Sequence, residues 1–274
     1  MSGDIVNSGT VGAASGVRGA VTSPASRMAA LARAELTLLG RSKSTLVTAV
    51  LIPLVLPLSF ANVIDDMDVE DIGLTTGLVL VPAAIGFSLL FGVYSALTAI
   101  YTARREELVL KRLRIGELRD GEILGGSALP VLTTALVQSL VLVAASTVVL
   151  DIPAPKVPQL AAVGLLLGLV MCAALGAVTA ALTRSVESAQ VTTAPFVMVS
   201  MMGSGVTFPL EMLPDRAATL CALLPLSPVI TLIRGGWTAD LSAYEALGAI
   251  STGLAWTVLA VFAVRRWFRW EPRR

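Results

Sequence analysis

The sequence predicts an all-α membrane protein, and two features of its composition support this prediction. Only 14% of its 274 residues are charged, whereas soluble domains carry about 25%, so the folded surface must face an apolar medium. The apolar residues also form long blocks. A helix needs about 20 mostly apolar residues to cross a bilayer, and a transmembrane β-barrel would show alternating strands of about ten residues instead. Uncharged blocks extend over 45–64, 72–103, 123–150, 157–183, 188–210, 217–233 and 246–264.

Six of these blocks predict transmembrane helices. Before the first of them, residues 1–26 are mostly Gly, Ser, Ala, Val and Thr with few large apolar side chains, and we expect a disordered tail because they have little to bury. Residues 27–42 have the spacing of an amphipathic helix, which would lie in the membrane interface. The membrane domain is therefore expected over 27–264, and a basic tail over 265–274. The six predicted spans are 45–64, 72–103, 123–150, 158–183, 191–208 and 243–264.

The basic residues predict the orientation of the chain. With both termini in the cytoplasm, 17 of the 20 lysines and arginines fall on the cytoplasmic side: five near the N-terminus, six in 104–122, Arg184 and five at the C-terminus. The other side keeps only Lys156, Arg216 and Arg234. Cytoplasmic loops carry such an excess of basic residues. The chain is thus predicted to be a multi-pass protein of the bacterial cytoplasmic membrane.

The uncharged stretch 217–233 is long enough to suggest a seventh span. A seventh span would put the basic tail outside the cell, which conflicts with the charge distribution. Pro225 and Pro228 fall near its middle, and proline removes backbone donors and bends a helix. We therefore predict an outer re-entrant helical hairpin that enters and leaves on the same side, just before the last helix.

Several kinds of chemistry are excluded or disfavoured. The chain has no histidine, which removes Ser–His and Cys–His catalysis and histidine-ligated metals. Its two cysteines, Cys172 and Cys221, form no metal or disulfide signature. The glycines that a P-loop requires are missing around Lys43, so no ATP site of that kind is expected. A lipid-modifying intramembrane enzyme and a non-transporting scaffold or assembly factor remain as alternatives to a transport subunit.

The segment 104–122 mixes charges with leucines, as in an amphipathic helix that ends near Gly116. It is either a topology signal on anionic lipid or a docking surface for a partner protein, and the four glutamates and one aspartate among its bases favour docking. Glu35 lies toward the apolar stripe of the amphipathic helix 27–42. It either snorkels to water or pairs with a cationic partner.

Three stretches in a fixed order resemble a known family, the type-2 permeases that form the membrane subunit of ATP-binding-cassette exporters, including daunorubicin-type drug exporters. The first stretch is Arg33-Ala34-Glu35 through Arg41, followed by Ile52-Pro53-Leu54. The second is Arg104-Arg105-Glu106-Glu107 with Leu110-Lys111-Arg112-Leu113-Arg114. The third is Gly205-Val206-Thr207-Phe208-Pro209 with Met212-Leu213-Pro214, Leu224-Pro225-Leu226-Ser227-Pro228 and Arg234. The family pattern at the second stretch is Glu-x-Gly-Thr-Leu-x-Arg-Leu; here Val109 replaces the small polar residue before Leu110, and the Gly-Thr pair is missing.

The resemblance implies a membrane subunit without an ATPase site of its own. Two permease subunits, identical or different, would form the path, and two separate ATPase subunits carrying ATP and Mg²⁺ would dock below them. The amphipathic helix and the segment 104–122 would receive the ATPase motion and pass it to a bundle that alternates between two packings. The expected coupling residues are Arg33, Glu35, Arg41, Glu106, Glu107, Lys111, Arg112 and Arg114.

The resemblance also implies a substrate path between the paired first, second and fifth helices. The few charges within the spans favour a hydrophobic or amphipathic substrate, such as a drug, an antibiotic or a lipid. Methionine and aromatic side chains would give such a path a soft and adaptable lining, although the same residues are equally consistent with ordinary lipid or helix contacts. The expected path residues are Met198, Met201, Met202 and Phe208. Efflux and antibiotic resistance would follow from this path.

Overall fold

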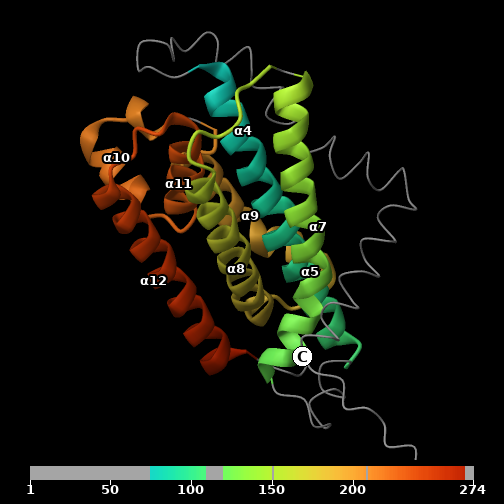
Figure 1. Ribbon diagram of the computed structural model, residues 1–274. Coiled ribbons are helices and arrows are strands. Elements are labelled where there is room, and N and C mark those ends of the chain that lie inside the picture. Colours follow the sequence, from blue (N-terminus) through green and yellow to red (C-terminus); the bar gives the residue numbers. More distant parts are fainter. Residues whose placement is uncertain (1–74, 109–119, 150, 208, 269–274) are drawn as a thin grey trace, which may run out of the picture.

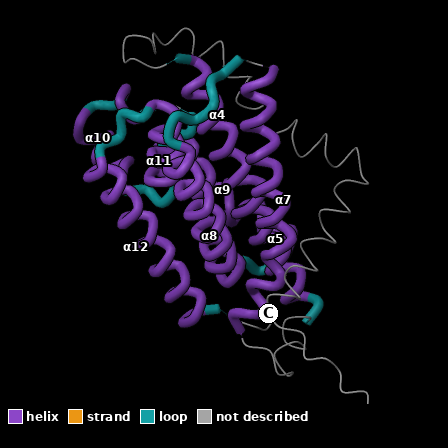
Figure 2. Tube along the Cα trace, in the orientation of Figure 1, coloured by secondary structure: helices purple, strands orange, loops and turns teal. Residues whose placement is uncertain are grey.

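The computed structural model describes residues 75–108, 120–149, 151–207 and 209–268, and every regular element in these ranges is a helix (Figures 1 and 2). The predicted tail 1–26, the amphipathic helix 27–42 and the span 45–64 lie outside the described residues. The described helices are α4 (Thr76–Phe87), the π-helix η2 (Ser88–Ser95), α5 (Ala96–Glu106), α7 (Asp120–Val149), α8 (Pro158–Leu182), α9 (Val186–Gly203), the 3₁₀ turn η3 (Leu210–Met212), α10 (Asp215–Ala222), α11 (Ser227–Thr238) and α12 (Ala243–Trp267).

Four helices of the described part are long and apolar enough to cross a membrane. They are Gly77–Glu106, in which α4, η2 and α5 are continuous, Gly121–Val148, Pro158–Leu182 and Ala243–Trp267. These four confirm the helices predicted at 72–103, 123–150, 158–183 and 243–264, with small shifts of their ends. The fifth predicted helix, 191–208, corresponds to α9, which begins at Val186 and ends at Gly203. The count of six spans therefore stays a prediction.

The boundaries of α9 have local causes that the hydropathy pattern does not reveal. Ser185 caps the helix: its side chain accepts from the backbone N of Ser188 at 3.3 Å, and the Ser188 hydroxyl accepts from the backbone N of Ser185 at 3.0 Å. Such a capping box satisfies two amides that the first turn of a helix leaves free. At the other end Gly205 has φ +72, a left-handed conformation that suits glycine. The predicted range 191–208 was wrong at both ends for these reasons.

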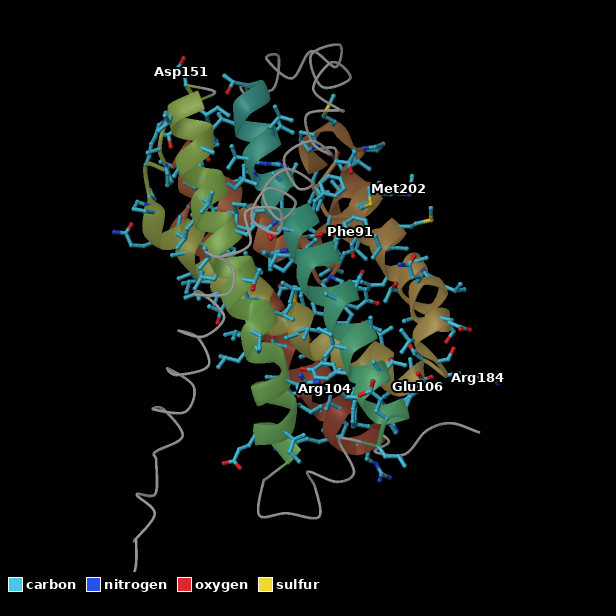
Figure 3. All side chains as sticks on the ribbon, turned by 90° about the vertical axis from the view of Figure 1, so that its right-hand side faces the viewer. Phe91, Arg104, Glu106, Asp151, Arg184 and Met202 are labelled. Carbon is cyan, nitrogen blue, oxygen red and sulfur yellow. The ribbon has the colours of Figure 1, made fainter. Side chains whose placement is uncertain are left out.

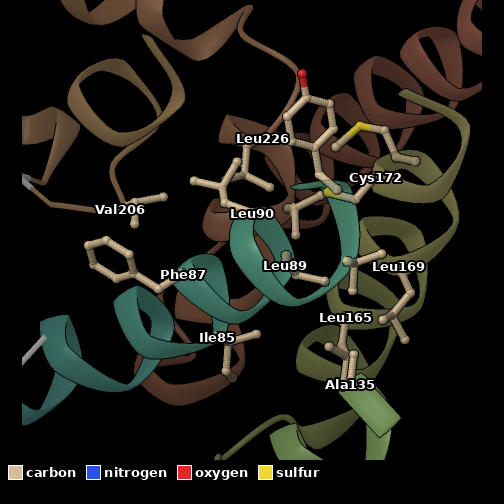
Figure 4. Packing of buried hydrophobic residues seen from close by; sticks show 14 of the residues in the cluster. Ile85, Phe87, Leu89, Leu90, Ala135, Leu165, Leu169, Cys172, Val206 and Leu226 are labelled. Atoms are coloured by element: carbon tan, nitrogen blue, oxygen red, sulfur yellow. The ribbon is translucent and has the colours of Figure 1, made fainter. Parts of the chain in front are cut away.

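The helix α8 lies at the centre of the described bundle. It packs against η2, α5, α7, α11 and α12, and Figure 1 shows it between α7 and α12. Its close approach to η2 depends on Gly176, because a Cβ there would lie 3.0 Å from the carbonyl oxygen of Tyr94. Figure 4 shows the resulting core, in which Leu89 and Leu90 of η2 lie near side chains of α8 and near Leu226.

The stretch predicted as a hairpin forms two helices, α10 and α11, bent by 102° at a short break. The break covers 223–226, so Pro225 lies in it as expected. Pro228 does not interrupt the helix, and that part of the prediction was wrong. It lies in the first turn of α11, where an amide has no partner within the helix and proline is favoured. The bend fits a broken span or a re-entrant loop, and re-entry stays a prediction.

Side chains donate to two backbone carbonyls at the bend between α10 and α11. The indole Nε1 of Trp256 on α12 donates to the carbonyl oxygen of Leu223 at 2.9 Å. The hydroxyl of Ser227 donates to the carbonyl oxygen of Cys221 at 2.5 Å. Irregular backbone at membrane depth is tolerated only where protein or a water-filled cavity satisfies it. These two bonds supply donors to carbonyls at the bend, as an intramembrane position would require.

Candidate functional site

A groove of about 630 Å³ lies between the second predicted span and α9. One wall comes from η2 and α5, and the other comes from α9. Most of its lining is apolar and small, with three polar side chains among them: Ser95, Gln190 and Thr193. The complete lining is Phe91, Ser95, Ala96, Ala99, Val186, Ala189, Gln190, Thr193, Ala194, Val197, Met198 and Met201. A groove of this kind suits a hydrophobic molecule that carries a few polar groups.

The structure places the predicted path residues in different positions. Met198 and Met201 both line the groove. Met202 does not line it and is 70% exposed on α9, and Figure 3 shows its side chain pointing away from the bundle. Phe208 lies outside the described residues. Phe91, 44% exposed on η2, is a groove residue that the sequence analysis did not single out.

The π-helix η2 forms part of the groove wall and is unusually long. A π-helix is uncommon, appears mostly as a single-turn bulge, and is frequent at functional sites. Its last residue, Ser95, donates from its hydroxyl to the carbonyl oxygen of Leu90 at 3.0 Å. Across the wall, the rings of Tyr94 and Phe196 lie 4.6 Å apart, so η2 and α9 are in direct contact behind the groove. The apolar pattern of 72–103 predicted a helix but gave no sign of the π geometry.

Charged residues gather at one end of the bundle, here called the Arg184 end. Figure 3 shows Arg104, Glu106 and Arg184 at this end and Asp151 at the other, here called the Asp151 end. Of the predicted coupling residues, Glu106 and Glu107 are described, and both are exposed at the end of α5. The remaining six lie outside the described residues: Arg33, Glu35, Arg41, Lys111, Arg112 and Arg114.

Arg105 is fully buried, whereas the sequence alone showed it as one of the cytoplasmic charges and as part of the second family stretch. Its Nη1 donates to the carbonyl oxygen of Ala180 at 2.7 Å, and its Nη2 donates to the carbonyl oxygen of Thr183. Both carbonyls belong to the C-terminal end of α8. The last four carbonyls of a helix lack partners within the helix, and a cation there also interacts favourably with the helix dipole. A buried arginine is thus stabilised without a carboxylate in either of these two bonds.

Arg234 is a second arginine that the structure buries, at the Asp151 end of the bundle. It is only 7% exposed, and its Nη2 donates to the carbonyl oxygen of Gly205 at 2.9 Å. Two further bonds fasten the same end of α11 to the chain before α8. Trp237 Nε1 donates to the carbonyl oxygen of Pro153 at 3.0 Å. The backbone N of Val157 donates to the carbonyl oxygen of Gly236 at 2.8 Å. The predicted hairpin is thereby joined to the chain after α9 and to the chain between α7 and α8.

The sequence model of the ABC-2 type transporter family matches residues 27–237, which is most of the chain. The chain belongs to the ABC-2 type transporter family. No curated protein gives a significant match to the sequence. As an ABC-2 permease, the chain is an integral membrane protein, a membrane subunit of an ABC transporter that lacks its own ATPase site and pairs with an ABC ATPase subunit. The resemblance to this family is confirmed, and the daunorubicin-like subtype stays a prediction.

The ABC-2 pattern explains an unusual backbone conformation at the end of α5. The family motif Glu-x-Gly-Thr-Leu places a glycine at the position of Leu108, which has φ +58. Leu108 therefore adopts the left-handed conformation that a glycine would take there without strain, whereas a residue with a Cβ is strained by about 1–2 kcal/mol. Its backbone N donates to the carbonyl oxygen of Arg105 at 3.1 Å, which ends the helix. Leu108 thus holds a conformation that would suit the glycine of the family pattern.

Proposed function

We propose that this ABC-2 permease is the membrane subunit of an ATP-driven exporter that moves a hydrophobic or amphipathic substrate, such as a drug, an antibiotic or a lipid, out of a bacterial cell. Two permease subunits, identical or different, form the path, and two ABC ATPase subunits supply the energy. ATP and Mg²⁺ bind to those partner subunits, and this chain needs no cofactor of its own. Efflux of an antibiotic by such a complex would confer resistance.

The groove between η2, α5 and α9 is the observation that supports this proposal. Its walls come from the second and fifth predicted spans, the helices between which the family resemblance implies a path. Its lining combines two methionines with small apolar residues and three polar side chains, a surface that adapts to amphipathic molecules of different shapes. In this mechanism ATP binding favours one of two packings of the bundle, so the groove opens first toward the inside and then toward the outside.

The proposed topology places the Arg184 end in the cytoplasm and the Asp151 end outside the cell. The Arg184 end holds the ends of α5 and α12 with their basic residues, and cytoplasmic segments carry such an excess. Both termini are then cytoplasmic, six helices span the membrane, and α10 with α11 forms a re-entrant hairpin at the outer mouth. The carbonyl contacts of Trp256, Arg234 and Trp237 support re-entry at membrane depth, since they satisfy irregular backbone in and beside the hairpin.

Copurification with an ABC ATPase and transport by the purified complex test this function. The complex, placed in inside-out vesicles, is expected to accumulate daunorubicin, used as a fluorescent amphipathic probe, only when ATP is supplied. Charge reversal of Lys111, Arg112 and Arg114 together should weaken ATPase association or transport but leave membrane insertion unchanged. A triple reversal at Arg269, Arg273 and Arg274, in the other basic segment, is the charge-matched control and should keep ATPase association. Unchanged copurification and transport after the first reversal would show that the segment 104–122 is only a topology signal.

A further inference from the structure

The segment 104–122, which we expect to receive the ATPase motion, is here called the coupling segment. The contact between Arg105 and the end of α8 joins this segment to the turn that leads into α9. Arg105 lies in the last turn of α5, next to the exposed Glu106 and Glu107. The carbonyls that it binds belong to Ala180, in the last turn of α8, and to Thr183, the C-cap residue of that helix. The chain enters α9 at Val186, three residues after Thr183. A displacement of Arg105 therefore acts on backbone close to the first turn of α9.

The turn between α8 and α9 is fixed by its own hydrogen bonds. The backbone N and the hydroxyl of Thr183 both donate to the carbonyl oxygen of Thr179, at 2.9 and 2.7 Å. On the other side, the capping box of Ser185 and Ser188 holds the first turn of α9. Arg184 is the single residue between Thr183 and Ser185. Because the turn has so little freedom, a force on Thr183 would reach α9 rather than be absorbed.

The neighbouring arginine contacts a different helix. Arg104 Nη1 donates to the hydroxyl of Ser127 on α7, and Tyr101 also reaches α7, where its hydroxyl donates to the carbonyl oxygen of Leu124 at 3.0 Å. Two successive residues of α5 thus hold two different helices. Of the two, only Arg105 holds the helix that continues into α9, one wall of the groove.

The side-chain chemistry at this position is specific. The two bonds run from two nitrogens of one guanidinium to two different carbonyls, and a planar fork with donors in fixed directions suits such a pair. A lysine has the charge but presents a single nitrogen, so it cannot reproduce both bonds with the same geometry. A glutamine would keep some volume and one amide donor group but would lose the charge that strengthens these bonds.

From this geometry we propose that Arg105 is a positioning residue that couples the ATPase to the groove. It binds the end of α8, so that movement of the coupling segment displaces the α8–α9 turn and, with it, α9. This inference rests on the function proposed above. It predicts that loss of the Arg105 side chain uncouples the complex: ATP is still hydrolysed, but α9 no longer responds to nucleotide. A residue that served only as a structural cap would lower stability and leave the response of the folded complex intact.

The test measures the response of α9 to nucleotide in the complex with its ATPase, reconstituted in lipid nanodiscs. A cysteine introduced at Met198, which is 67% exposed and lines the groove, reports on α9 through its rate of reaction with a maleimide, in a Cys221→Ser background. With Arg105 present, the rate is expected to differ several-fold between the nucleotide-free complex and the complex trapped with ATP and vanadate. Arg105→Gln should abolish the difference while the complex assembles and hydrolyses ATP, and Arg105→Lys should retain only part of it.

Arg184→Gln is the matched control, because it removes an exposed arginine from the same turn without touching either carbonyl that Arg105 binds. It should keep the full difference in reaction rate. An assembled Arg105→Gln complex with a normal response, whatever its thermal stability, would overturn the inference and leave the proposed function standing. A chain that does not copurify with an ABC ATPase would overturn the proposed function and this inference together. A Met198→Cys complex with Arg105 intact, whose reaction rate ignores nucleotide, would overturn this inference alone. If Arg105→Gln does not assemble, the assembled Arg105→Lys complex decides, and a full response there contradicts the proposal.

Discussion

Two buried arginines, one at each end of the bundle, bind backbone carbonyls in different settings. Arg105, on α5, reaches two carbonyls at the end of α8, beside the tight turn that leads into α9. Arg234 reaches the carbonyl oxygen of Gly205, a residue of irregular left-handed backbone after α9. The first contact therefore joins two regular helices, α5 and α8, whereas the second fastens the predicted hairpin to a loop.

The difference shows that burial of a charge does not by itself assign a role. Both arginines are expensive to remove from water, and both are compensated by charge-assisted hydrogen bonds. What distinguishes the two arginines is the structure of the backbone to which the accepting carbonyl belongs. The chain continues from Thr183 directly into α9, which forms one wall of the groove, so Arg105 can transmit movement to that wall. Gly205 also lies close to α9, two residues after its last residue, but the backbone there is irregular and left-handed rather than a capped turn, so we expect Arg234 to act mainly on the stability of the proposed outer mouth.

The largest expected effect is an all-or-none difference in thiol labelling between the two ends of the bundle. It tests whether the two arginines lie on opposite sides of the membrane. Single cysteines in place of Asp215 and Asp240, both exposed, should react with a membrane-impermeant thiol reagent added outside intact cells. A cysteine in place of Arg184, exposed at the other end, should react only after the cells are opened. Reaction at Asp215→Cys without reaction at Asp240→Cys would mean that α10 and α11 together cross the membrane. The proposed topology would then be wrong.

The next effect separates stability from coupling. Arg234→Met is expected to destabilise the chain by about 1.5–3 kcal/mol, the usual contribution of a hydrogen bond from a charged group, because the carbonyl of Gly205 loses its donor. The nucleotide response at Met198→Cys should persist. Thermal unfolding in detergent measures the first effect and maleimide reactivity measures the second. Arg216→Met, at an exposed arginine of α10, is the control and should change neither. Loss of the response in Arg234→Met would erase the distinction between the two arginines.

A smaller effect is expected at the hairpin tip. Trp256→Phe keeps an aromatic ring but removes the donor to the carbonyl oxygen of Leu223, which should lower stability by about 1 kcal/mol. Trp267→Phe is a matched control on the same helix, because that indole is 63% exposed. Equal thermal midpoints for the two variants would indicate that the tip carbonyl finds water instead, as it would if the tip were not in the membrane.

The smallest effect is expected at Leu108, and its sign is opposite. Leu108→Gly should stabilise the chain by about 0.5–1 kcal/mol, because relief of the left-handed strain outweighs the extra freedom that glycine gives the unfolded chain. Glu107→Gly, one residue earlier at φ −73, should instead destabilise it by about 0.5–1 kcal/mol. Comparison of the two thermal midpoints checks the sign. A loss of stability in Leu108→Gly would show that the leucine side chain makes a compensating contact.

The sequence alone determined the class of the protein and four of its spans, because hydropathy reflects the transfer of whole helices into lipid and depends little on the neighbours of each residue. Its loose motifs also determined the family. Only the tertiary structure decided the π geometry of η2, the groove against α9, and the contrast between Arg105 and Arg234. The sequence does not reveal which backbone carbonyl at a helix end needs a hydrogen-bond donor from another helix. Which arginine reaches it depends on how helices from distant parts of the chain pack together.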